Sequence, residues 1–108
     1  MALWYVYKYA LRHLDAELLF AKNGQAALEI LDSKTPTLVI LDMRLPLVSG
    51  LELLKHFQRV LRLANTPIIL TSSMKEYSTL APNGVFIHKP AKPDAITRTV
   101  DNVLALTG

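Results

Sequence analysis

The stretch TLVILDMRLPLVSG, from Thr37 to Gly50, determines how the rest of this chain is organised. The residues from Thr37 to Leu41 are apolar or β-branched without polar alternation, which is typical of a parallel strand that is buried on both faces. Asp42 follows at the carboxyl end of this strand. In an open α/β sheet, ligands bind in the crevice outside the carboxyl ends of the strands. The pattern therefore places Asp42 where a functional site is expected.

The composition favours a single globular domain that spans residues 1–108. The hydrophobic content of 51% is sufficient for one core, and the chain is too short for two. No apolar run approaches the length of about 18 residues typical of a membrane helix, and the basic start of a signal peptide is missing. The absence of cysteine excludes disulfides and Cys-ligated zinc. We therefore expect a soluble, cytoplasmic protein without a membrane partner.

The charge balance does not indicate a nucleic-acid partner, although the net charge is +3. The basic residues are spread along the chain. Lys55, Arg59 and Arg62 share one face of a predicted helix, and we interpret them as a solvated helix face. No pair of helices separated by a tight turn suggests a DNA-recognition element.

Predicted strands and helices alternate along the chain. Leu3–Tyr9 has strand propensity, but the apolar spacing continues to Leu14 and favours a helix. The polar residues 72–84 leave room for at most a short helix. This alternation predicts an open parallel α/β sheet of four strands with helices on both faces. The predicted helices are Ala2–Leu14, Gly24–Asp32 capped by Asn23, a segment from the capping-box residue Ser49 to about Leu63, and Asp94–Leu106, and the predicted strands are Ala16–Phe20, Thr37–Leu41, Thr66–Thr71 and Val85–His88.

Three polar residues, Asp42, Thr71 and Lys89, stand at or just after the ends of predicted strands. Because the carboxyl ends of parallel strands share one edge of a sheet, we expect these side chains to converge. A carboxylate can attack a phosphoryl group, while a hydroxyl and an ammonium can hold its oxygens. The alternative is a structural ion pair between Lys89 and Asp42.

At these residues the chain resembles the receiver domain of two-component response regulators, a family with a flavodoxin-like fold. The matching motifs are Asp42-Met43-Arg44-Leu45-Pro46 with Gly50, Thr71-Ser72, Phe86 before Lys89-Pro90, and Asn23-Gly24. The resemblance implies that Asp42 accepts a phosphoryl group from a sensor histidine kinase or a phosphotransfer protein in a phosphorelay. Any enzymatic activity would be limited to phosphorylation and dephosphorylation of Asp42 itself.

The resemblance also implies roles for the neighbouring residues. Thr71 and Lys89 would contact the phosphoryl oxygens, and Thr71 and Phe86 would act as the switch that changes a partner-binding face. The backbone carbonyl of Arg44 would bind Mg²⁺ together with Asp42, and the peptide bond before Pro90 would be cis.

The chain departs from the family pattern at its beginning, because nothing acidic precedes Asp15. We expect the first family strand and its acidic pair of Mg²⁺ ligands to be missing, so that phosphotransfer is slower than in an intact relative. The strands Ala16–Phe20 and Thr37–Leu41 would then pair directly, recruit a strand in a homodimer or a strand exchange, or leave the protein poorly soluble. A short interval between Thr71 and Lys89 predicts a stunted helix before the last strand.

The sequence leaves one alternative to an active receiver open and disfavours another. A degenerate pseudo-receiver would keep the fold and bind partners without phosphate. A nucleotide-binding flavodoxin-like protein is disfavoured, since no Gly-rich phosphate loop follows a strand. Trp4 and the tyrosines at positions 5, 7 and 9 are interpreted as helix packing, or as surface exposed by the missing strand.

Overall fold

A computed structural model describes residues 2–21, 23–43, 50–63, 65–81 and 85–107 of the protein. Its described strands form a parallel sheet in the order β1-β2-β3, with β1 at Val39–Asp42, β2 at Ile68–Ser72 and β3 at Phe86–His88. In this register Asp42 lies opposite Thr71, and Ser72 lies opposite His88. The strand ends that carry the predicted site residues are therefore aligned at one edge of the sheet.

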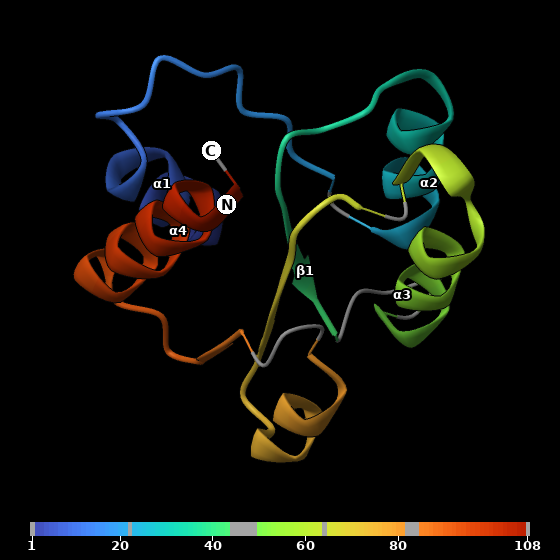
Figure 1. The fold of residues 1–108 in the computed structure, drawn as a ribbon. Coiled ribbons are helices and arrows are strands. Elements are labelled where there is room, and N and C mark those ends of the chain that lie inside the picture. The colour runs from blue at the N-terminus through green and yellow to red at the C-terminus, as the bar shows by residue number, and fades with distance from the viewer. Residues whose placement is uncertain (1, 22, 44–49, 64, 82–84, 108) are drawn as a thin grey trace.

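Helices cover both faces of this sheet, as Figure 1 shows. Helices α1 (Ala2–Ala10) and α4 (Pro93–Thr107) lie together on one side, and α2 (Gly24–Ser33) and α3 (Gly50–Arg59) lie on the other. The predicted α/β architecture with a parallel sheet between helices is confirmed. Two 3-10 helices complete the described elements, namely η1 (Leu61–Leu63) and η2 (Lys75–Leu80).

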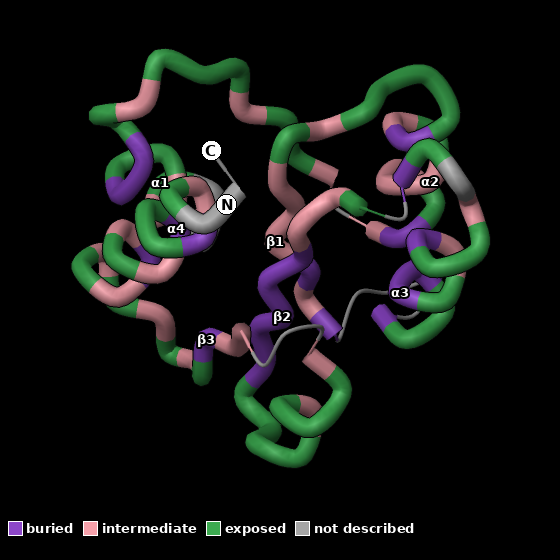
Figure 2. Tube along the Cα trace, in the orientation of Figure 1, coloured by how far each residue is buried: buried purple, intermediate pink, exposed green. Residues whose placement is uncertain are grey.

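The core is divided by the sheet into two apolar clusters, because successive side chains of a strand point to opposite faces. Along β2, Ile68 and Leu70 pack with α2 and α3, whereas Ile69 packs with α1 and α4. All five residues of β2 are buried, and the purple central trace of Figure 2 marks this strand. The continuous apolar pattern of the central strands thus reflects burial on both faces.

The predicted fourth strand at Ala16–Phe20 does not form. The segment is irregular, and it connects α1 on one side of the sheet to α2 on the other (Figure 1). Of the three outcomes expected for a missing strand, direct pairing with Thr37–Leu41 does not occur, since within the described residues β1 pairs only with β2. A strand needs a neighbouring strand to satisfy its backbone groups, and local β propensity does not supply one.

Element boundaries differ from the sequence predictions at a few places. Leu3–Tyr9 is helical, and α1 ends at Ala10 in a turn in which the Leu14 N–H donates to the Leu11 carbonyl. The predicted cap of α2 is confirmed, since Oδ1 of Asn23 accepts a hydrogen bond of 2.8 Å from the N–H of Ala26. The short segment before the last strand is the 3-10 helix η2, in agreement with a stunted helix. The Ser49 capping box lies outside the described residues.

Candidate functional site

Asp42 and Lys89 form an ion pair at the carboxyl edge of the sheet. Asp42 is the last residue of β1, and Lys89 follows β3 directly. The Nζ of Lys89 donates to Oδ2 of Asp42, and the side chains retain 22% and 29% exposure for Lys89 and Asp42 respectively. The pair is therefore reachable from solvent, at an edge where ligands of α/β sheets bind.

Thr71 lies in register with Asp42, but its hydroxyl is directed to the other neighbouring strand. The side chain is 2% exposed, and Oγ1 donates a hydrogen bond of 2.9 Å to the carbonyl of Ile87. The adjacent Ser72 is also buried, and its Oγ accepts a hydrogen bond from the N–H of Met74. Asp42, Thr71 and Lys89 thus meet at one edge of the sheet as predicted, while the Thr71 hydroxyl proton is donated to a carbonyl of the sheet itself.

The last strand brings Phe86 and His88 close to this edge. Phe86 is partly buried against the cluster under α2 and α3, and its ring stacks on that of His88 with a centroid distance of 6.5 Å. Nε2 of His88 lies 3.0 Å from the carbonyl oxygen of Ser73. The peptide bond between Lys89 and Pro90 is cis. The predicted switch aromatic therefore lies on the strand that leads directly into Lys89.

Gly50 allows α3 to begin against the backbone of the site. A Cβ atom at this position would stand 2.4 Å from the Cα of Met43 and 3.0 Å from the carbonyl oxygen of Asp42. Real side chains do not tolerate such a separation from backbone, so the close approach of helix and strand end requires glycine. Gly50 thus allows the start of α3 to pack directly against the backbone of Asp42 and Met43.

Comparison with known proteins shows the family of this chain. The family model described as "Response regulator receiver domain" matches residues 3–101. The chain belongs to the response regulator receiver domain family. It is 33% identical over 104 residues to the phosphate regulon transcriptional regulatory protein PhoB of Pseudomonas aeruginosa, covering 92% of this chain and 45% of that protein. It is 35% identical over 68 residues to the Regulator of RpoS of Escherichia coli, covering 63% of this chain and 20% of that protein.

Solved structures of response regulators share this fold. The Francisella response regulator 1452 receiver domain superimposes with a TM-score of 0.82 at 20% identity, covering 99% of this chain and 91% of that one. The bacteriophytochrome response regulator AtBRR gives a TM-score of 0.74 at 24% identity, covering 92% and 82% of the two chains. The receiver chain described here spans less than half the length of the two curated relatives.

Receiver domains generally bind Mg²⁺ and interact with histidine kinases or phosphotransfer proteins. Among the described residues of this receiver, no group of three His, Cys, Asp or Glu side chains is placed to hold an ion. Mg²⁺ requires near-octahedral oxygen coordination, usually with carboxylates and phosphate. The Arg44 carbonyl, the other ligand that the resemblance implies, lies outside the described residues.

The sequence predicted only a packing or surface position for Tyr7, but its phenol is affected by both Thr71 and Asp42 of the candidate site. Burial raises the pKa of its phenol and the negative charge of Asp42 raises it further, whereas the nearby Thr71 hydroxyl acts to lower it. The hydroxyl oxygen is buried and makes no hydrogen bond of normal geometry with a described group. The only sequence signal is that Tyr7 lies four residues before the buried Leu11, on the inward side of α1.

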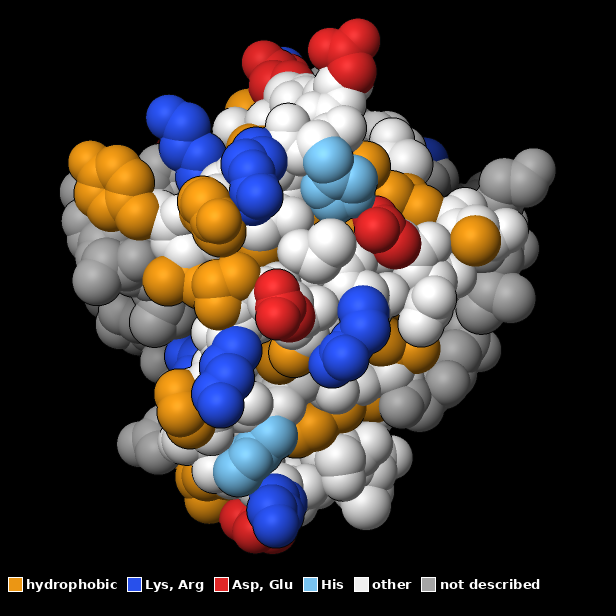
Figure 3. Space-filling model, turned by 90° about the vertical axis from the view of Figure 1, so that its left-hand side faces the viewer, with side chains coloured by type: hydrophobic (Ala, Val, Ile, Leu, Met, Phe, Trp, Pro, Cys, Tyr) orange, Lys and Arg blue, Asp and Glu red, His pale blue; other side chains and the backbone are white. Residues whose placement is uncertain are grey.

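A second surface feature of the receiver lies between α1 and α4, on the face shown in Figure 3. None of the strand-end residues contributes to this groove. Basic, acidic, histidine and hydrophobic side chains are interspersed over the face rather than separated by sign. The groove is lined by Tyr9, Ala10, Arg12, His13, Pro93, Asp94, Thr97 and Arg98.

Among the described helices, none has both the length and the apolar character needed to cross a bilayer.

Proposed function

We propose that this chain is a signalling receiver that accepts a phosphoryl group on Asp42 from the phosphohistidine of a histidine kinase or a phosphotransfer protein. One observation carries the proposal: a solvent-reachable carboxylate stands at the carboxyl edge of the sheet, paired with Lys89, in a chain of the receiver family. The family match supports the reaction class. The position of Asp42 supports the choice of residue.

The proposed transfer is a displacement at phosphorus. One carboxylate oxygen of Asp42 forms an O–P bond while the P–N bond of the phosphohistidine breaks, and the released imidazole takes up a proton from solvent. The transferred group brings oxygens that the Lys89 ammonium can neutralise, as it now does for the Asp42 carboxylate.

The proposed switch follows from the contacts that Thr71 would exchange. To contact a phosphoryl oxygen, its hydroxyl would leave the carbonyl of Ile87, to which it now donates. Ile87 lies between Phe86 and His88 on β3, so release of this bond would act on the strand that carries the aromatic pair. Phosphorylation would thereby shift the population of two packings at this edge. A cytoplasmic partner would recognise the shifted packing.

A pseudo-receiver that binds partners without phosphate is the second candidate. It is favoured by the lack of a metal-binding group among the described residues and by the existing ion pair of Asp42. Within this candidate, Lys89 and Asp42 would stabilise the fold and would not prepare a reaction.

Intact-mass spectrometry after incubation with acetyl phosphate separates the two candidates. We expect a phosphoryl-sized mass gain in the wild type and none in Asp42→Asn, with both proteins shown to be folded by circular dichroism. The same incubation in buffers with Mg²⁺ and with EDTA measures how far the reaction depends on the metal. A folded wild type without mass gain would favour the pseudo-receiver.

A further inference from the structure

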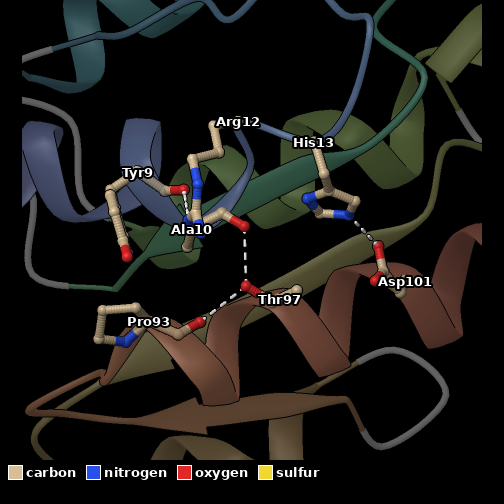
Figure 4. Close-up of polar contacts among 7 residues, drawn as sticks. All are labelled: Tyr9, Ala10, Arg12, His13, Pro93, Thr97 and Asp101. Carbon is tan, nitrogen blue, oxygen red and sulfur yellow. Dashed lines mark hydrogen bonds and ion pairs between the residues drawn. The ribbon is translucent and has the colours of Figure 1, made fainter.

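Tyr7 is held in place by the contacts between α1 and α4. Oγ1 of Thr97 on α4 donates across the interface to the carbonyl of Ala10 at 2.7 Å, and the His13 ring lies 2.8 Å from Asp101 (Figure 4). Ala10 and Leu11 are buried against α4. These contacts pin the C-terminal end of α1, one turn after Tyr7, and so direct the tyrosine toward the sheet.

The ring of Tyr7 packs against the apolar cluster that includes Ile69 and Ile87. Ile69 lies two positions before Thr71 on the same strand, β2, and Ile87 lies opposite Thr71 on β3. The phenol therefore reaches the interior beside the strand ends, where it is affected by both Thr71 and Asp42.

The hydroxyl of Tyr7 is the one buried side-chain polar atom without a hydrogen-bond partner in the part of the chain that the structure describes. Buried polar groups nearly always have a partner, so an exception calls for an explanation. The groups next to the Tyr7 hydroxyl do not provide this explanation. Thr71 is close enough to affect the pKa of the Tyr7 phenol, but the Thr71 proton is donated to the carbonyl of Ile87.

A buried donor thus faces a site that would gain negative charge. The Lys89 ammonium is already engaged with Asp42, and the Thr71 proton is already engaged with β3. Phosphorylation of Asp42 would add oxygens that need donors, and the Tyr7 hydroxyl makes no hydrogen bond of normal geometry with a described group. The phosphoryl group would need hydrogen-bond donors, and the Tyr7 hydroxyl is a donor that can turn to it.

We propose that the Tyr7 hydroxyl donates a hydrogen bond to a phosphoryl oxygen carried by Asp42. This inference rests on the proposed function. Tyr7 keeps its proton throughout, no covalent bond to it forms or breaks, and the phosphoryl oxygen is the acceptor that the unphosphorylated protein lacks. The hydroxyl is a neutral donor that lowers the free energy of the phosphorylated state relative to the unphosphorylated one.

The test follows phosphoryl gain and loss by intact mass in the full chain, using acetyl phosphate as the donor and then its removal by rapid desalting. The variants are Tyr7→Phe, the control Tyr5→Phe, whose exposed residue lies on the same helix, and Asp42→Asn. We expect Tyr7→Phe to lose its phosphoryl group about tenfold faster than the wild type, the effect of one hydrogen bond to a charged acceptor. Tyr5→Phe should match the wild type.

Urea unfolding of the same unphosphorylated proteins distinguishes this role from a structural one. Removal of an unpartnered buried hydroxyl should leave the midpoint of Tyr7→Phe unchanged or raised. A lowered midpoint would show that the hydroxyl is already bonded before phosphorylation, and it would overturn the inference.

Two further outcomes separate this inference from the proposed function. Equal phosphoryl lifetimes in wild type and Tyr7→Phe would overturn the role of Tyr7 and leave Asp42 as the acceptor. A folded wild type that gains no phosphoryl group would overturn the proposed function and the role of Tyr7 with it.

Discussion

The two sides of the sheet approach the candidate site in different ways. On the α2 and α3 side, Gly50 brings the start of a helix directly against the backbone of Asp42 and Met43. On the α1 and α4 side, the Tyr7 side chain reaches the strand ends and buries a hydroxyl that has no partner among the described groups. One side therefore supports the position of Asp42 through close backbone packing, and the other supplies a polar group that can respond to a change at the site.

The largest change in stability is expected on the side of the sheet covered by α2 and α3. Phe57 on α3 is 2% exposed and is one of the largest fully enclosed side chains in the described core. Phe57→Ala should lower the free energy of unfolding by about 3–5 kcal/mol, because it leaves a cavity beneath the sheet. Urea unfolding measures this change. The adjacent exposed Gln58→Ala should stay within about 0.5 kcal/mol of the wild type.

Gly50→Ala tests the close backbone approach itself. The added Cβ would meet backbone atoms that cannot rotate away, so we expect a loss of about 1–3 kcal/mol in the free energy of unfolding. Leu51→Ala, at an exposed position of the same helix, is the control. Wild-type stability in Gly50→Ala would contradict the claim that this side is held by backbone contact.

A smaller effect is expected where α1 joins α4. Thr97→Val removes a hydroxyl that is shared between the Ala10 carbonyl on α1 and the Pro93 carbonyl of its own helix, and it should lower the free energy of unfolding by about 0.5–1.5 kcal/mol. Thr99→Val is the matched control, because Thr99 donates only to the Ala95 carbonyl within its own helix. Equal losses in the two variants would argue that the contact between the helices contributes nothing of its own.

The smallest effect concerns alkaline pH and Tyr7. Its pKa is raised in the folded protein by burial, so the folded state keeps the phenol proton while an unfolded chain loses it near pH 10. The stability associated with this proton is complete below about pH 10 and is lost as the pH rises through the folded pKa. Tyr7→Phe should therefore lose less stability than the wild type over this range.

Urea midpoints measured below and above about pH 10 would check this expectation. Tyr5→Phe should follow the wild type, because its side chain is exposed on the same helix. The same slope in Tyr7→Phe and wild type would indicate that the phenol is solvated in the folded protein, and it would remove the contrast between the two sides.

The sequence predicted much of this architecture because its signals are local. The uniform apolar run before Asp42 reflects a strand with helices on both faces, and the Asn23 cap acts within one turn of its own helix. The strand at Ala16–Phe20 was predicted wrongly, since strand formation depends on a partner that local propensity does not reveal. The proposed role of Tyr7 could not be predicted from the sequence, because the spacing of α1 indicates which helix face is inward and not which groups surround the phenol.

The order of residues along the chain is enough to predict that a carboxylate, a hydroxyl and an ammonium stand at one edge of a parallel sheet, because it shows which side chains follow the strands. The pairing of these groups depends on the folded arrangement, in which Lys89 pairs with Asp42 and Thr71 donates to the carbonyl of Ile87. The folded arrangement also determines that Tyr7 buries a hydroxyl without a partner among the described groups beside them. The physical reason is that strand order follows from patterns along the chain, whereas hydrogen-bond partners depend on how residues distant in sequence pack together.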